Sequence, residues 1–402
     1  MRQSLNITDN TEKRKTMIVS RVACMNWRNI PECDIPLTSG INVLWGMNAQ
    51  GKSNILESIY FFARGRSFRG AKEKELVRFG SDFSIARIDF RRDGYTRDTS
   101  LEAVIPLTGK KKLSRNDAPL SSTSEMMGTF RAVLFCPSNL TIVSGGPLER
   151  RTFLDIAISQ LSPKYLYHVR RYSKLLAERN ALLKQAAGGQ QVSAEEWEVY
   201  AEALSESAAW IASFRREYVG MLNSAVGRYF SGMTDGRETP TISYSSQIPD
   251  DTTVEPLTHS SDEPDKTVLI NKLTENIERE TIVGSTLYGV HKDDIILSLN
   301  GKEAKLYASQ GQQRSIVLSM KLAEAEIARE IGGEFPVILL DDVFSELDEE
   351  RRRYILSSLG SSSDRQIIIT SCEPDVIPEA SSGGVNFLRV ENGTVTPCGN
   401  GG

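Results

Sequence analysis

A glycine-rich loop at residues 46–53 could bind phosphate. Its sequence, GMNAQGKS, satisfies the phosphate-loop pattern GxxxxGK[ST]. The glycines let backbone N–H groups converge on phosphate oxygens, Lys52 reaches the β- and γ-phosphates, and the Ser53 hydroxyl can hold Mg²⁺. An apolar run at residues 41–45 precedes the loop, and a pattern of helical period begins at Asn54. The sequence therefore predicts a strand, a phosphate-binding loop and a helix in succession.

Two adjacent carboxylates, Asp341 and Asp342, end a second apolar run with the sequence VILLDD. In a parallel sheet the carboxyl ends of the strands face the ligand crevice, so both acids would reach the phosphate site. There Asp341 would hold Mg²⁺ through water, and Asp342 would orient or deprotonate the attacking water. An acid pair at a strand end is often only a solvated turn or a helix cap. Beside a phosphate loop, however, it favours nucleotide hydrolysis.

A third motif, SQGQQR at residues 309–314, directly precedes a long helical pattern at residues 315–331. Ser309 and Gly311 place a hydroxyl and bare N–H groups at a helix start, which suits a γ-phosphate. In this class of fold such a helix lies far from Lys52 within one subunit. The motif would therefore complete the site only from a second subunit. The alternative is that it merely caps a structural helix.

The elements that position these motifs alternate between strand and helix towards the carboxyl end, which implies a parallel sheet. Residues 149–230 instead form a long, charged pattern of helical period, interrupted at Gly188 and Gly189, which predicts an αα-hairpin or a small helical lobe. We therefore expect a split α/β domain. Its expected parts are a flexible extension (1–16), a first half (17–120), an inserted helical lobe with a linker (121–266) and a second half (267–402).

The composition fits a globular protein with at least one large core. Of the 402 residues, 40% are hydrophobic and 25% are charged, and the formal charge is −4. No run reaches the roughly 18 apolar residues that a membrane-spanning helix needs, so we expect no membrane-spanning segment. The five cysteines lack CxxC spacing, which favours a reducing cytoplasm over a disulfide framework or a zinc site. The near-neutral total charge neither requires nor excludes binding to nucleic acid, because such binding depends on local basic patches.

Together the motifs resemble the bacterial RecF family of recombination and repair ATPases, which is related to SMC and ABC-type ATPases. The resemblance rests on GMNAQGKSN at residues 46–54, GRSFR at 65–69, SQGQQR at 309–314 and LLDDVFSELD at 339–348. It also includes NWRN at 26–29, GGPLERRTFLD at 145–155, ERNALLK at 178–184 and HKDD at 291–294. It implies an α/β fold, an ABC-type P-loop ATPase head with an inserted, mainly helical lobe.

The resemblance also implies roles for individual residues around ATP and Mg²⁺. The implied ATP-binding residues of the loop are Gly46, Asn48, Gly51, Lys52, Ser53 and Asn54. Ser53 and Asp341 would hold the metal, and Asp342 would act with Lys52 and Asp341 in catalysis. The signature donated by the second subunit would be Ser309, Gly311 and Gln312. Asn139 stands where the family usually has an acidic residue in its metal-sensing loop.

The family further implies a head-to-head dimer that forms on ATP and a DNA-stimulated ATPase whose slow hydrolysis resets the dimer. The implied partners are DNA, as duplex and at single-strand junctions, and the proteins RecR and RecO, which act with it in loading RecA at single-strand gaps. Candidate DNA contacts are Arg64, Arg66 and Arg69, which follow the loop helix. Such a cluster is more commonly a solvated face.

Two other functions remain open at this point. An SMC-like structural or defence ATPase would act on protein partners, and a longer coiled coil or an appended nuclease domain would favour it. A P-loop kinase would transfer the γ-phosphate to a small molecule. The kinase would need a closing lid and an acceptor pocket, and residues 309–314 would have no role in it.

Overall fold

The computed structural model describes residues 16–92, 97–234, 236, 238–250, 254–258, 262–359, 365–374 and 385–398. The expected extension lies outside these ranges except for Thr16, which already forms a bridge to Phe335. Among the described residues, no helix combines the length and the apolarity that crossing a membrane requires.

The first sheet is antiparallel, with strand order β2-β1-β4-β5-β6-β7. Apolar and polar residues alternate along its longer strands, so one face is buried and the other is partly exposed. Its strands are β1 (Met17–Trp27), β2 (Ile30–Pro36), β4 (Phe83–Arg92), β5 (Thr99–Pro106), β6 (Lys112–Arg115) and β7 (Ala118–Leu120). Strands β4 and β5 pair antiparallel along the whole length of β5.

The second sheet has the order β15-β14-β3-β13-β12-β8, and its neighbours pair in parallel except for the β14–β15 hairpin. Continuous apolar runs form its central strands because both of its faces are covered. The strands are β3 (Gly40–Trp45), β8 (Ala132–Phe135), β12 (Val337–Asp341), β13 (Gln366–Ser371), β14 (Asn386–Glu391) and β15 (Thr394–Cys398). The predicted parallel sheet is thereby confirmed.

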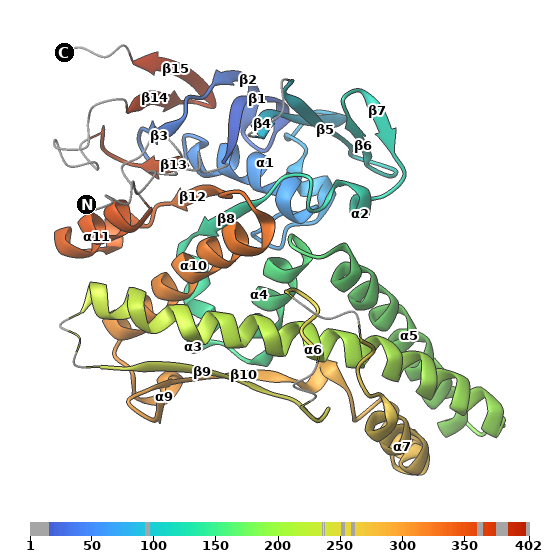
Figure 1. Cartoon of the computed structure of the whole chain (residues 1–402). Helices are drawn as coiled ribbons and strands as arrows, with labels where there is room; N and C mark the ends of the chain where they lie inside the picture. Colours follow the sequence, from blue (N-terminus) through green and yellow to red (C-terminus); the bar gives the residue numbers. More distant parts are fainter. Residues whose placement is uncertain are drawn as a thin grey trace, which may run out of the picture.

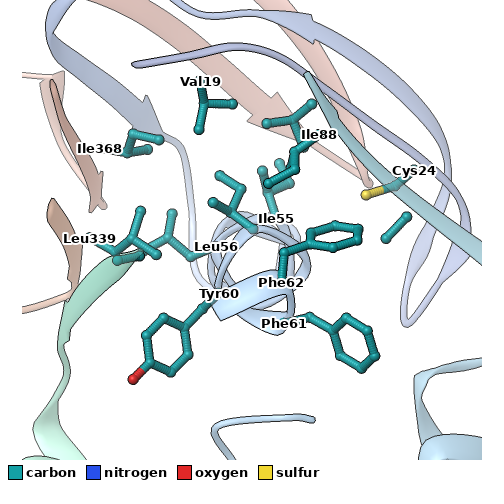
Figure 2. Close-up of a cluster of buried hydrophobic side chains, with 14 of the residues drawn as sticks. Val19, Cys24, Ile55, Leu56, Tyr60, Phe61, Phe62, Ile88, Leu339 and Ile368 are labelled. Atoms are coloured by element: carbon teal, nitrogen blue, oxygen red, sulfur yellow. The ribbon is translucent and has the colours of Figure 1, made fainter. Parts of the chain in front are cut away.

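Helix α1 (Lys52–Arg64) lies between the two sheets, and Gly65 caps its carboxyl end in the left-handed conformation. Figure 2 looks along this helix and shows apolar side chains radiating from it, among them Leu56 and Phe62. On one side they meet Leu339 and Ile368 of the parallel sheet, and on another they meet residues of the antiparallel sheet. The phosphate loop is therefore anchored to the centre of the head by a buried helix.

The opposite face of the parallel sheet is covered by α10 (Gln310–Gly332) and α11 (Glu349–Leu359). Successive residues of a strand point to opposite faces of the sheet, so β12 contributes side chains both to the layer of α1 and to the layer of α10 and α11. Leu339 packs in the core around α1, whereas Ile338 and Leu340 pack with residues of α10 and α11. Helices α1 and α10 thus lie on opposite faces of one sheet.

A mainly helical lobe extends from the head and occupies the lower part of Figure 1. Its long helices are α4 (Pro147–Ser159), α5 (Pro163–Ala187) and α6 (Ala194–Met233). The turn between α5 and α6 contains Gly188 and Gly189, so the predicted αα-hairpin is confirmed. The lobe also holds α7 (Thr267–Glu275), α8 (Ile277–Val283), α9 (Ala304–Tyr307), β9 (Pro240–Ser245), β10 (Asp294–Leu299) and β11 (Lys302–Glu303).

The expected boundaries of this insertion differ from the structure at both ends. Within 121–266, strand β8 belongs to the head, where it pairs with β12. Within 267–402, strand β10 pairs with β9 and packs in the lobe core. Short turns complete the chain: η1 (Glu73–Leu76), α2 (Thr123–Met126), η2 (Pro137–Leu140), α3 (Thr141–Ser144), η3 (Val290–Lys292) and η4 (Phe344–Glu346).

Candidate nucleotide-binding site

The phosphate loop leaves β3 in a backbone conformation that requires glycine at two positions. Gly46 has φ 149°, and a Cβ atom there would lie 2.3 Å from the carbonyl oxygen of Val390. Gly51 has φ 111°, and its Cβ would lie 2.9 Å from Oδ1 of Asn29. Neither position has room for a side chain. The loop therefore passes closely by strand β14 and the β1–β2 turn.

Two turns also hold the loop by hydrogen bonds. Asn29, in the β1–β2 turn, donates from Nδ2 to the Ala49 carbonyl at 3.1 Å. Gly393, in the β14–β15 turn, donates its N–H to the Gln50 carbonyl at 2.9 Å. Neither bracing role is evident from the sequence, although Asn29 belongs to a stretch that carries the family resemblance. The shape of the loop is therefore set by contacts far away in the chain.

Lys52 is positioned by the first turn of α1 and lies over the loop. Its side chain is buried, and Nζ donates to the carbonyl oxygens of Gly46 at 2.5 Å and Met47 at 2.7 Å. An ammonium held this way can exchange the two carbonyls for phosphate oxygens without a large movement. Asn48, at the loop tip, accepts from the thiol of Cys372 at 3.0 Å.

Asp341 ends β12 beside the first residues of α1. The residue is 6% exposed, its Oδ1 accepts from the Thr370 hydroxyl at 3.0 Å, and the Ser53 hydroxyl also hydrogen-bonds to its carboxylate. Burial raises the pKa of Asp341, and the bonds from Ser53 and Thr370 oppose that rise. A carboxylate beside a hydroxyl offers the hard oxygen ligands that Mg²⁺ prefers. The residues therefore fit the metal that the sequence predicts.

Asp342 is exposed and turns away from the strand. Its φ is 51°, in the left-handed region that a non-glycine residue seldom adopts. Its N–H donates to Oγ1 of Thr370 at 2.9 Å, and its carbonyl accepts from the Ser345 hydroxyl at 2.9 Å. Asp342 is thus exposed at the edge of the sheet where the phosphate loop leaves β3.

The start of α10 is capped within the subunit and remains exposed. Gln312 donates its N–H to the Ser309 hydroxyl at 3.3 Å, and Ser309 donates its N–H to Oε1 of Gln312 at 2.6 Å. This reciprocal pair is a capping box, so within one subunit Ser309 does cap the helix, as the alternative interpretation expects. Gly311, in the first turn, is half-buried. Because α1 and α10 cover opposite faces of the sheet, this helix start does not belong to the layer that holds Lys52.

The three candidate DNA-contacting arginines have different surroundings. Arg64 donates to the Ser67 carbonyl at 3.2 Å, and burial lowers its pKa. Arg69 donates to Oδ1 of Asn54 at 2.9 Å, so it lies beside the phosphate-loop helix. Arg66 is exposed on the surface. The three arginines thus differ in exposure and bonding, although the charge of Arg66 also acts on Arg64.

Asn139 acts locally within the turn that the resemblance connects with metal sensing. Its Oδ1 accepts from the N–H of Cys136 at 2.9 Å, which is a common use of asparagine at a turn. Cys136 and Asn139 also line a mainly apolar cavity against Arg314 and Lys321 of α10. The turn after β8 therefore packs against α10, the helix that Ser309 caps.

Comparison with known sequences finds relatives over almost the whole chain. The family described as RecF/RecN/SMC N terminal domain matches residues 18–396. The DNA replication and repair protein RecF of Ruminiclostridium cellulolyticum is 36% identical over 387 residues, which cover 95% of this chain and all of that protein. The protein of the same name from Clostridium novyi is 36% identical over 94% of this chain and 99% of its own length.

Solved structures give the same result. A structure of the recombination mediator protein RecF with ATP in the RecFOR pathway superposes with a TM-score of 0.85 at 32% identity, over 95% of this chain and 98% of that one. An Smc head domain from Pyrococcus furiosus superposes with a TM-score of 0.55 at 14% identity, over 95% and 96% of the two chains. The second likeness concerns the fold alone. It agrees with an ABC-type head in which two sheets enclose a phosphate-loop helix.

Proposed function

The chain belongs to the RecF family, and from this premise we propose that it is an ATP-dependent DNA-binding protein of recombinational repair. ATP binding joins two copies head to head, the dimer binds DNA near single-strand gaps, and slow hydrolysis to ADP and phosphate releases it. The activity is that of a DNA-stimulated ATPase acting in the cytoplasm. The ATP-bound RecF structure at 32% identity supports the choice of nucleotide.

One observation carries the dimer proposal. The phosphate loop and the acid pair meet at one edge of the parallel sheet, whereas the Ser309 helix covers the opposite face and presents an exposed start. A helix start with bare N–H groups is suited to an anion. The phosphate loop of the same subunit, however, lies in the layer on the other face of the sheet. A two-fold axis would bring the Ser309 start of each copy to the loop of the other. Both sites are then completed together.

The chemistry follows from the residues already described. Loop N–H groups and Lys52 bind the β- and γ-phosphates, while Ser53 and Asp341 would hold Mg²⁺. The metal supplies positive charge that neutralises phosphate oxygens. Asp342, exposed at the strand end, orients the attacking water and accepts its proton. Ser309 and Gly311 of the second copy donate to the γ-phosphate. Catalysis thus depends on position and electrostatics, with no covalent intermediate.

DNA binding is supported by basic residues near the loop helix. Lys111 donates from Nζ to the carbonyl of Gly65 at 2.8 Å, which brings the β5–β6 loop beside Arg66. Lys110, Lys112 and Arg66 are exposed, and together we call them the basic surface. Several cations on one surface suit the phosphates of duplex DNA without reading its sequence.

The partners follow from the family rather than from the site. The related structure is described as a recombination mediator in the RecFOR pathway, which supports RecR and RecO as partners. We propose that this chain acts with them at duplex to single-strand junctions and so assists RecA loading indirectly. Pull-down of RecR on gapped DNA, with and without ATP, tests this step. Equal capture under both conditions would contradict an ATP-dependent assembly.

Sedimentation velocity with and without ATP and Mg²⁺ tests the proposed function as a whole. The protein should sediment as a monomer alone and as a dimer at saturating nucleotide, and gapped DNA should move with the dimer. ADP serves as the control, because it lacks the γ-phosphate that the Ser309 helix start would bind. A monomer under all conditions would contradict the proposal.

A further inference from the structure

Thr370 occupies a central place between the phosphate loop and the acid pair. It lies near the carboxyl end of β13, the strand between β3 and β12 in the sheet. It pairs with Leu44 on one side and with Asp341 on the other, and it is 1% exposed. Its hydroxyl therefore sits among groups that the proposed reaction uses, yet no role has been given to it so far.

The hydroxyl of Thr370 contacts both acids at the same time. It donates its single proton to Oδ1 of Asp341 at 3.0 Å and accepts the N–H of Asp342 at 2.9 Å. A hydroxyl has one donor and two acceptor positions, so the first bond leaves its oxygen available for the second. The two bonds together fix the orientation of the hydroxyl.

Each bond constrains a different feature of the acid pair. The bond to Asp341 fixes one oxygen of the carboxylate that also bonds to the Ser53 hydroxyl, and these two residues are the proposed metal ligands. The bond from Asp342 ties down the backbone of a residue held at φ 51°. A left-handed aspartate is unfavourable by itself and persists only where surrounding contacts impose it. Ser345 holds the carbonyl of the same residue from the other side.

We propose that Thr370 is a positioning residue that holds Asp341 and Asp342 in register, through one hydroxyl bonded to both. The inference rests on the proposed ATP hydrolysis and adds to it a residue that acts through Asp341 and Asp342. Loss of the hydroxyl leaves the phosphate loop intact but removes one hydrogen bond from each of the two acids. ATP binding should therefore persist while turnover falls.

Two substitutions separate this role from simple packing. Thr370→Val keeps the branched shape and removes the hydroxyl, whereas Thr370→Ser keeps the hydroxyl and removes a methyl group. We expect Thr370→Val to lower kcat by about tenfold or more with little change in KM, and Thr370→Ser to stay within about threefold of wild type. A packing role would give the reverse order, because the serine variant loses buried apolar volume.

The matched control is Thr286→Val in the helical lobe. Thr286 is also buried, and its hydroxyl accepts from Arg179 at 2.9 Å and donates to Asn180 at 2.8 Å. This variant loses two hydrogen bonds of the same kind, far from the acid pair. It should destabilise the protein to a similar degree and leave kcat unchanged. A drop in kcat equal to that of Thr370→Val would overturn the inference.

A second readout needs no nucleotide. Thermal unfolding of Thr370→Val, Asp341→Ala and the double variant forms a double-mutant cycle in the free protein, since alanine removes the oxygen that accepts the Thr370 hydroxyl. We expect non-additive shifts in Tm, because each single variant breaks the same bond. Additive shifts would contradict the proposal that the Thr370 hydroxyl holds Asp341 in place. The two proposals fail separately. Wild type that hydrolyses no ATP contradicts the proposed function, whereas active wild type with an equally active Thr370→Val contradicts only the positioning role.

Discussion

The two halves of the proposed ATP site differ in how far a single subunit builds them. On the loop side, Lys52, Ser53, Asp341 and Asp342 are held by hydrogen bonds from several strands and turns. On the signature side, Ser309 is exposed, and its hydrogen bonds among the described residues lie within its own helix cap. The first half is organised before any partner arrives, and the second needs one. Nucleotide binding and hydrolysis should therefore be separable by mutation.

The largest effect is expected at the exposed acid of the organised half. Asp342→Asn keeps the shape of the side chain but removes the charge that orients water, so turnover should fall by about 10²–10⁴-fold. ATP binding should survive, because the loop and Lys52 are unchanged, and the dimer should persist longer. Phosphate release and nucleotide titration measure the two quantities. Normal turnover in this variant would show that another group handles the water.

The exposed half is tested by Ser309→Arg. A long cation at the helix start should weaken the ATP-dependent dimer by about a hundredfold or more, while the monomer keeps its affinity for ATP. Ser193→Arg is the matched control, since Ser193 caps α6 by accepting the N–H of Glu196 at 3.2 Å. Both variants lose a serine cap, but only the first should lose the dimer in sedimentation. Equal dimerisation of the two would refute the proposed role of Ser309.

A smaller effect tests whether the loop side is organised by its neighbours. Gly46→Ala would place a Cβ 2.3 Å from the Val390 carbonyl and should cost about 1–3 kcal/mol of stability, with weaker ATP binding. Gly189→Ala is the control, because Gly189 also has positive φ but no atom within 4 Å of the added Cβ. Chemical denaturation compares them. If both variants lose the same stability, backbone strain explains the result without the contact.

The smallest effect is expected on DNA. Arg66→Ala should weaken duplex binding about two- to fivefold at 0.1 M salt and should reduce the slope of log affinity against log salt by about one. Arg64→Ala is the comparison, because Arg64 is partly buried and bonded to Ser67, and its slope should match wild type. Binding measured across a salt series gives both slopes. An unchanged slope for Arg66→Ala would remove this residue from the DNA-binding surface.

Local patterns predicted the loop side well. The apolar run before residue 46, the glycines of the loop and the helical period after it all lie in adjacent residues, and the strand, loop and helix follow in that order. The family and the α/β head with its helical lobe are confirmed. Even the αα-hairpin was visible, because helical period persists over many turns.

Features that depend on long-range contacts were not predictable. Strand β8 is only four residues long and buried on both faces, so its sequence does not reveal that it joins the head rather than the lobe. Strand β9 lies within the segment expected to be a linker. Its partner β10 is distant in sequence, so the local pattern does not reveal the pairing. For the same reason, neither the bracing of the loop by Asn29 nor the double contact of Thr370 follows from local patterns. Both depend on which strands become neighbours.

A mixing experiment tests most directly whether the site is completed by a second copy. Asp342→Asn and Ser309→Arg each inactivate a homodimer, but a mixed dimer pairs the intact loop and acids of one copy with the intact helix start of the other. Equal amounts should therefore recover up to about a quarter of wild-type turnover, since half of random dimers carry one intact site. If Ser309 acts within its own subunit, every site in the mixture carries a defect. A mixture as inactive as its components would contradict the shared site.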